Sequence, residues 1–171
     1  SYTEAAAVTD LSKMTLTKKT FKTFNEFQYF TSVKTVPSSY FSTIDSLREI
    51  TFPKSITTIG SSAFKVCVNL TAVVMNEGVE NINGEAFSGC KNLTNIYLPE
   101  SVTSIGYGAF QYCSSLTSIS IPEGVTSIDD YAFRDCTNLT NISIPEIVTS
   151  IGDWAFYNCS SLTSITLSEG V

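Results

Sequence analysis

The sequence predicts a repeat solenoid, and two observations lead to this fold class. The cysteines recur at a constant separation of 23 residues, at Cys67, Cys90, Cys113, Cys136 and Cys159. Phenylalanine recurs with the same period three residues before each cysteine, and leucine recurs three residues after it. A fixed period of about 20 to 50 residues is typical of chains that stack one short structural unit on the next. We therefore expect a stack of similar coils.

Each unit contains one short segment with the pattern of a half-buried strand. In Leu116–Ile121 the apolar side chains fall on one side of an extended chain and the polar ones on the other. Pro99, Pro122 and Pro145 follow three of these segments and lack the N–H group that would continue a ladder. The strand is therefore expected to end at this point and the chain to turn.

The rest of each unit is expected to cross to the opposite side of the coil and return. A V-x-x-I segment, as in Val125–Ile128, follows the turn. The segment A-F-x-x-C-x-x-L then places three apolar residues at intervals of three, which is compatible with a short helical or 3₁₀ turn. One unit buries too little apolar surface to offset the entropy of ordering its backbone, so the units are expected to be stable only when stacked.

The period divides the chain into an irregular beginning and a regular remainder. Residues 47–171 form regular coils, and residues 21–46 form a degenerate, aromatic-rich first coil, so that the solenoid covers residues 21–171. Residues 1–20 fit no column and are expected to be a cap, a linker or a frayed end. The sequence stops at Val171 inside a repeat, so we expect the natural protein to continue.

The register of the first coil follows from subtracting the period once more from the regular columns. This step aligns Phe24 with Leu47 and Phe27 with Ile50. We therefore expect these phenylalanines to occupy the strand columns of the first coil.

The pattern resembles the leucine-rich repeats of the BspA-like type over about residues 21–171. The motifs that carry the resemblance are L-x-x-I-x-I-P, V-x-x-I and A-F-x-x-C-x-x-L, as in Leu116–Leu139, whereas Asn76 and Ser168 replace the proline of the motif. The resemblance implies a right-handed coil with a parallel sheet of short strands on the concave face and turns on the convex side. It also implies a secreted or surface protein that binds or adheres to other proteins.

Composition and charge exclude several classes of function. The chain has no histidine, so a Ser-His-Asp or Cys-His nucleophile is impossible, and its acidic residues are repeated rather than unique, so we expect no enzyme and no cofactor. The formal net charge of -6 argues against nucleic acid. Residues 1–65 sum to +3 and residues 66–171 to -9. No stretch approaches about eighteen apolar residues, so we expect no membrane span.

The main candidate binding surface is the outer face of the expected concave sheet, which we expect to be continuous. Its strand residues that do not face the core are small and neutral, with one tyrosine. They are Asn95, Tyr97, Ser118, Ser120, Asn141, Ser143, Ser164 and Thr166. We expect a partner that is a protein, such as a host matrix or cell-surface protein, and an extracellular or cell-surface location. The alternatives are that these residues merely cover a sheet, or that the chain is a structural spacer projecting another domain.

Two further sets of side chains give weaker candidates. Aromatic residues expected on the convex side suggest carbohydrate binding, or else they pack on neighbouring coils: Tyr107, Tyr112, Tyr131, Trp154 and Tyr157. A glutamate recurs just after the strand and suggests a weak calcium-binding ridge, or else a solvated edge: Glu77, Glu100, Glu123, Glu146 and Glu169. The cysteines are expected to be buried free thiols, because they lie on an apolar stripe.

Overall fold

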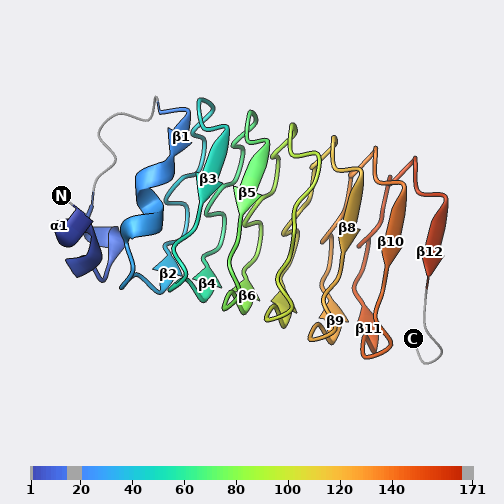
Figure 1. Ribbon diagram of the computed structural model, residues 1–171. Coiled ribbons are helices and arrows are strands. Elements are labelled where there is room, and N and C mark those ends of the chain that lie inside the picture. The colour runs from blue at the N-terminus through green and yellow to red at the C-terminus, as the bar shows by residue number, and fades with distance from the viewer. Residues whose placement is uncertain (1, 15–20, 167–171) are drawn as a thin grey trace.

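A computed structural model describes residues 2–14 and 21–166. The chain winds into a row of stacked coils that runs from the N-terminal to the C-terminal end of the molecule (Figure 1). Strands of neighbouring coils pair in parallel, and in the regular coils the paired residues are 23 positions apart, as in Ile142 with Ile165 and Ile59 with Ile82. The repeat solenoid predicted from the period is confirmed.

One row of strands follows the predicted L-x-x-I-x-I segments, and we call it the first sheet. It contains two parallel ladders of three strands each. The first ladder consists of β1 (Thr23–Phe24), β3 (Glu49–Thr51) and β5 (Ala72–Val74), and the second of β8 (Ser118–Ser120), β10 (Asn141–Ser143) and β12 (Ser164–Thr166). The coil between them joins the row through a single bridge from Asn95 to Ser118. The expected continuous sheet is therefore interrupted on the N-terminal side of Asn95.

A second parallel sheet, of six strands, lies beside the first and was not predicted. Its strands are only two residues long and end on the isoleucine of the V-x-x-I segment or its counterpart. They are β2 (Thr35–Val36), β4 (Thr58–Ile59), β6 (Asn81–Ile82), β7 (Ser104–Ile105), β9 (Ser127–Ile128) and β11 (Ser150–Ile151). Two residues are too few to show an alternating pattern, so the sequence carries no distinct strand signal here.

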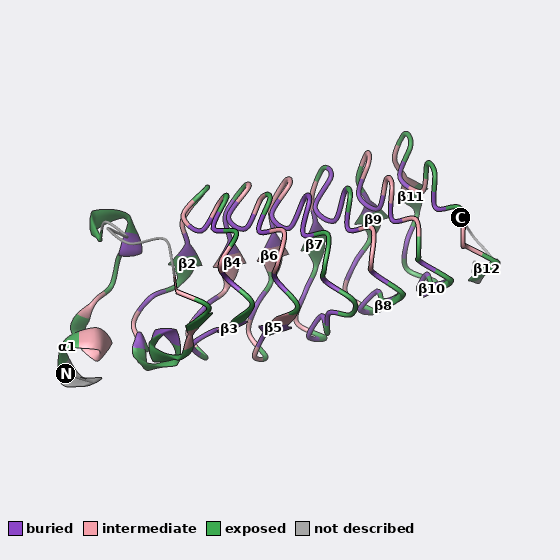
Figure 2. Ribbon diagram, turned by 90° about the horizontal axis from the view of Figure 1, so that it is seen from above, coloured by how far each residue is buried: buried purple, intermediate pink, exposed green. Residues whose placement is uncertain are grey.

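The A-F-x-x-C segment forms turns on the side of the coil opposite the first sheet. In Figure 2 these turns lie along the upper border, across from β3, β5 and β8. The N–H of Cys113 donates to the carbonyl of Phe110 at 3.2 Å, which is the i→i+3 bond of a 3₁₀ turn. The N–H of Phe110, however, donates to Ala132 of the next coil at 2.9 Å. The segment is therefore a chain of turns tied to the neighbouring coil and not a continuous helix.

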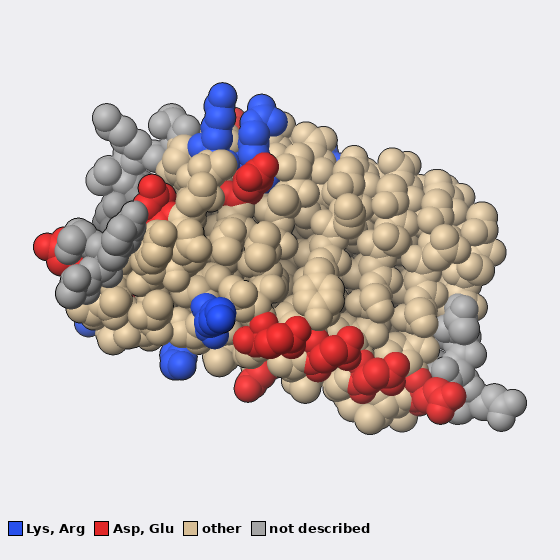
Figure 3. All heavy atoms as spheres, in the orientation of Figure 1, with Lys and Arg blue, Asp and Glu red and all other residues tan. Residues whose placement is uncertain are grey.

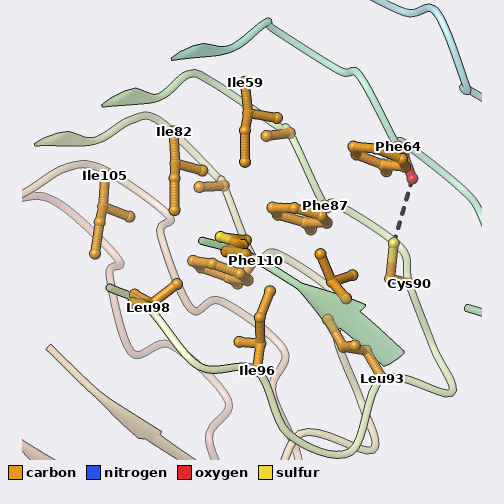
Figure 4. Packing of buried hydrophobic residues seen from close by; sticks show 14 of the residues in the cluster. Ile59, Phe64, Ile82, Phe87, Cys90, Leu93, Ile96, Leu98, Ile105 and Phe110 are labelled. Carbon is orange, nitrogen blue, oxygen red and sulfur yellow. Dashed lines mark hydrogen bonds between the residues drawn. The ribbon is translucent and has the colours of Figure 1, made fainter. Parts of the chain in front are cut away.

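The core of the solenoid is a set of apolar columns that run along the stack. The rings of Phe64, Phe87 and Phe110 lie parallel, with centroids 5.2 and 5.6 Å apart (Figure 4). These rings are fully buried, as are the alanine and leucine columns of the same coils. Figure 2 shows the buried residues along the inner side of each coil. Each internal coil thus has its two flat faces covered by its neighbours, as a stacked repeat requires.

The five cysteines are free and buried, which confirms the expectation of structural thiols. Each thiol donates its S–H to the carbonyl of a phenylalanine in the preceding coil. The bond from Cys90 to Phe64 is 3.2 Å long and is drawn in Figure 4. The equivalent bond from Cys113 to Phe87 has the same length. The column therefore contributes a hydrogen bond between coils as well as apolar packing.

The register of the first coil differs from the predicted one. Thr23 pairs with Glu49 and Phe24 with Ile50, which is an offset of 26 residues in place of 23. Further along the coil, Thr35 pairs with Thr58 at the normal offset. The three additional residues therefore lie between β1 and β2, where the chain forms the 3₁₀ helix η2 (Asn25–Tyr29). The predicted alignment of Phe24 and Phe27 was wrong, because subtracting a constant period assumes that no residues are inserted in the first coil.

Residues 2–14 lie against the N-terminal end of the stack (Figure 1). They form the helix α1 (Tyr2–Ala7) and the 3₁₀ helix η1 (Leu11–Lys13). The side chain of Asp10 caps η1 by accepting a hydrogen bond from the N–H of Ser12. Leu11 is only 1% exposed. The hydroxyl of Ser32 donates to the carbonyl of Ala6 at 2.8 Å. These contacts cover apolar surface that the first coil would otherwise expose.

Candidate binding surfaces

The outer face of the first sheet presents the predicted neutral side chains to solvent. Those of Asn95, Tyr97, Ser118, Ser120, Asn141, Ser143 and Ser164 are exposed. The backbone of Thr166 is described as part of β12, and its side chain lies outside the described part of the structure. Figure 3 looks onto this side of the molecule and shows a broad region without charged residues over β5, β8 and β10. The structure therefore brings this set together on one uncovered surface.

A row of acidic side chains borders this neutral surface along its lower edge (Figure 3). Glu77, Glu100, Glu123 and Glu146 are all exposed, and Glu169 lies outside the described residues. The hydroxyl of Tyr97 donates to Oε1 of Glu77 at 3.0 Å. This hydrogen bond to a carboxylate raises the pKa of Tyr97 and ties the one aromatic ring of the face to the acidic row.

The glutamate row does not form a chelating site in the part of the chain that the structure describes. Among those residues, no group of three carboxylates or thiols is placed to hold a metal ion. Calcium ordinarily takes six to eight oxygen ligands that converge on one point, and a straight row does not supply them. The row is thus best described as a charged border of the sheet.

The aromatic side chains predicted for the turn side form one connected cluster, which we call the aromatic patch: Tyr107, Tyr112, Tyr131, Trp154 and Tyr157. The ring centroids of Tyr107 and Tyr131 are 5.3 Å apart, and those of Trp154 and Tyr157 are 4.6 Å apart. All of the rings except Tyr131, which is half-buried, are exposed. Tyr107 thus contacts a ring of the next coil and Trp154 contacts a ring of its own coil, and a large aromatic surface stays open.

Arg134 connects the members of the aromatic patch and was missed from the sequence. Its guanidinium lies 5.4 Å from the ring centroid of Tyr131, 5.3 Å from that of Tyr157 and 6.0 Å from that of Tyr112. These are distances at which a cation is attracted to a ring face. Its proximity to Tyr157 could have been predicted from the period, because the two residues are 23 positions apart and therefore share a column.

Arg134 is hydrogen-bonded to its neighbour Asp135, which is bonded in turn to the next coil. Its Nε donates to Oδ2 of Asp135 at 3.0 Å, and the other carboxylate oxygen of Asp135 accepts from Nδ2 of Asn158 at 2.7 Å. Since Asp135 is engaged on both sides, its charge is compensated locally and the arginine is held in place. The centre of the patch is thus held in place by contacts within the chain.

A hollow of about 370 Å³ adjoins the patch at Tyr112. It lies at Gly89, which shares a column with Val66 and Tyr112 but has no side chain. Lys65 contributes to the rim and is paired with Glu85 at 2.7 Å. A second hollow, of about 250 Å³, lies near Lys54 and contains no carboxylate among its lining residues. The lining residues of the larger hollow include one carboxylate, Glu85.

The comparisons with known proteins agree with this geometry. The family model of the BspA type leucine rich repeat region matches in six copies, over residues 14–137 and 103–171. The chain belongs to the BspA-type leucine-rich repeat family. The resemblance inferred from the repeat motifs is therefore confirmed. A comparison with curated proteins finds no match.

Solved structures of bacterial leucine-rich proteins are similar in fold and sequence. A leucine rich cell surface protein from Faecalibacterium prausnitzii is 35% identical, with a TM-score of 0.73, over 86% of this chain and 42% of that one. The leucine rich repeat protein of T. pallidum is 31% identical, with a TM-score of 0.61, over 77% of this chain and 72% of that one. A leucine-rich repeat protein from Bacteroides ovatus is 27% identical, with a TM-score of 0.60, over 78% of this chain and 41% of that one.

The BspA-type chain thus spans less than half the length of the F. prausnitzii protein that it resembles. Leucine-rich repeats of this family are in general protein-interaction modules, and the fold is typically not catalytic. Among the described residues, no helix is both long and apolar enough to span a membrane.

Proposed function

We propose that this chain is a non-catalytic protein-binding or adhesion module of a secreted or surface protein. Its partner, a host matrix or cell-surface protein, binds the outer face of the first sheet. The observation that carries the proposal is the neutral, exposed surface over β5, β8 and β10. The description of the F. prausnitzii relative as a cell surface protein supports the same location for this one.

The chemistry of the face suits an extended protein contact. Asn141, Ser143 and Ser164 offer hydrogen-bonding groups that are small and cost little entropy to order. Tyr97, which is 59% exposed, supplies an aromatic anchor of the kind that dominates protein interfaces. Because β8, β10 and β12 are held in a parallel ladder, Asn141, Ser143 and Ser164 have fixed backbone positions relative to one another before binding.

A pull-down with host extracellular-matrix proteins tests this proposal. The test variant carries Tyr97→Glu, Asn141→Glu and Ser143→Glu on the first sheet. The matched control carries three glutamates on exposed positions of the second sheet, Ser104→Glu, Ser127→Glu and Ser150→Glu. We expect the unmodified chain and the control to retain the partner equally and the test variant to lose it, because buried unpaired charge opposes binding.

Equal capture by all three proteins would exclude the first sheet as the binding face. Absence of any captured protein, together with a second domain that binds when this chain projects it from a surface, would favour the structural spacer instead. A circular dichroism spectrum and an unfolding midpoint unchanged from the parent are needed for both variants, so that loss of binding is not loss of folding.

A further inference from the structure

The aromatic patch and its surroundings form a second surface, on the turn side of the solenoid. It combines tyrosine, tryptophan and arginine, the residue types that are enriched in the energetic centres of protein interfaces. Trp154 is 54% exposed and Tyr157 is 48% exposed, although each ring contacts the other. In the described part of the chain, no other cluster of rings leaves as much aromatic surface exposed to solvent.

The charges beside Tyr131 and Trp154 are negative, whereas Lys65 and Lys91 line the hollow at the Tyr112 end of the patch. Asp129 and Asp153 are exposed and Asp130 is half-buried, and they flank Tyr131 and Trp154 in the sequence. The backbone N–H of Asp153 donates to Oδ1 of Asp130 at 2.7 Å, so the Asp130 carboxylate lies against the backbone of the next coil. In the described part of the chain, none of these carboxylates has a salt bridge to a cation. Arg134 is the only cation that follows Lys91 in the sequence, and Asp135 compensates it.

The arrangement of the rings favours a cation over a flat ligand. Trp154 and Tyr157 are inclined at 61°, and Tyr107 and Tyr131 at 54°, so neither pair forms a planar platform. Inclined rings can instead surround a positive group and direct their negative faces at it. The guanidinium of Arg134, within 6.0 Å of three ring centroids, shows that the tyrosines of this patch already accept a cation.

We propose that the aromatic patch binds a basic protein segment. Arginine or lysine side chains of the segment lie on the exposed rings of Trp154 and Tyr157, and their charges pair with Asp129, Asp130 and Asp153. This partner differs from the one proposed for the first sheet in its chemistry and in the face that it contacts. Either proposal can therefore fail without the other.

Trp154 provides a direct readout, because it is the only tryptophan of the chain. The probe is a short synthetic peptide in which arginine alternates with glycine and leucine, and the comparison peptide has glutamate in place of arginine. We expect the basic peptide to change the tryptophan emission in a saturable manner and the acidic peptide to leave it unchanged. Binding is expected to weaken between about 0.05 M and about 0.5 M salt, because exposed charges are screened.

Matched variants locate the binding site with a fluorescently labelled basic peptide. Tyr157→Ala is expected to weaken binding about tenfold, whereas Ile147→Ala, which removes an equally exposed apolar side chain outside the patch, is expected to change it less than about twofold. The double variant Asp129→Asn, Asp153→Asn is expected to weaken binding and to reduce its dependence on salt. The comparison requires that each variant has the same unfolding midpoint as the parent, so that weaker binding is not caused by loss of folding.

Three results would overturn the proposal. The first is a change of tryptophan emission with neutral oligosaccharides and none with the basic peptide, which would assign the patch to carbohydrate. The second is equal binding of the basic and the acidic peptide. The third is basic-peptide binding that Tyr157→Ala leaves intact.

Discussion

The phenylalanine column shows how single residues hold the coils together. Phe110 is fully buried, and its ring stacks on Phe87 and on Phe133 at 5.6 Å on either side. Replacing it by alanine leaves a cavity that the two flanking rings cannot fill without breaking their own stacks. We expect Phe110→Ala to lower the free energy of unfolding by about 3 to 5 kcal/mol and Phe110→Leu by less, as measured in urea. A loss below about 1 kcal/mol for the alanine variant would contradict this packing.

Val66 occupies a backbone conformation that suits its side chain poorly. Its φ of 60° is left-handed, which a β-branched residue rarely adopts. Asn158 lies in the same column with a φ of 57°, and asparagine tolerates this conformation. Because Val66 is exposed, Val66→Asn loses little packing, and we expect it to raise the free energy of unfolding by about 1 kcal/mol.

The control for this substitution is Val74→Asn, at an exposed valine in β5. Strand backbone favours β-branched residues, so this change is expected to destabilise the chain slightly. If both substitutions lower the stability alike, the strain assigned to Val66 is wrong.

At the scale of elements, the buried cysteine column is expected to lower the free energy of unfolding when the pH becomes alkaline. Burial raises the pKa of the Cys90, Cys113 and Cys136 thiols well above the ordinary value of 9.0, and that of Cys159 to about 11. The stability linked to each neutral thiol is complete below pH 9, because the unfolded chain releases its protons first. It is lost as the pH rises through the pKa of that thiol in the folded chain, which is about 11 for Cys159 and well above 9.0 for the other three. Each thiol contributes a slope of about 1.4 kcal/mol per pH unit within that window.

Guanidinium unfolding of the parent and of Cys113→Ala, measured across this pH range, checks the linkage. The variant is expected to be less stable at neutral pH, since it loses a side chain and the hydrogen bond to Phe87. It is also expected to show a shallower alkaline decline, because one titrating group has been removed. Equal slopes for the two proteins would contradict the assignment of the decline to the thiols.

The two sheets show which elements a sequence of this kind can predict. β10 was predictable because Asn141 and Ser143 flank an apolar Ile142 that is followed by Ile144 and a proline. β9 was not, because it spans only Ser127–Ile128 and is held by pairing with the adjacent coils. The turn side was predicted in position but not in hydrogen bonding, since the inter-coil bond from Phe110 to Ala132 depends on the stack.

The candidate surfaces were predictable to the extent that they follow the period. Tyr131 and Trp154 share a column, so their proximity in adjacent coils could be inferred. Arg134 was overlooked because a single cation breaks no apolar pattern. The interruption of the first sheet beside Asn95 could not be predicted either, because the apolar pattern continues through that coil and only the pairing changes.

At the scale of the whole molecule, the stack is expected to lose stability locally when its N-terminal end is disturbed. Leu11 is buried against the first coil, and repeat units contact only their neighbours. We expect Leu11→Ala to cost about 2 to 5 kcal/mol in the N-terminal region. Hydrogen exchange should show faster exchange in β2 and β3 and little change in β8 and β10. Uniformly faster exchange along the chain would mean that the solenoid unfolds as one unit.

Adhesion under flow measures directly whether the first sheet is the binding face. Beads coated with the unmodified chain, with the first-sheet glutamate variant or with the second-sheet control are passed over a surface of host matrix protein under flow. We expect the unmodified chain and the control to retain beads equally and the first-sheet variant to retain no more than uncoated beads. Equal retention of all three kinds of bead would contradict this expectation.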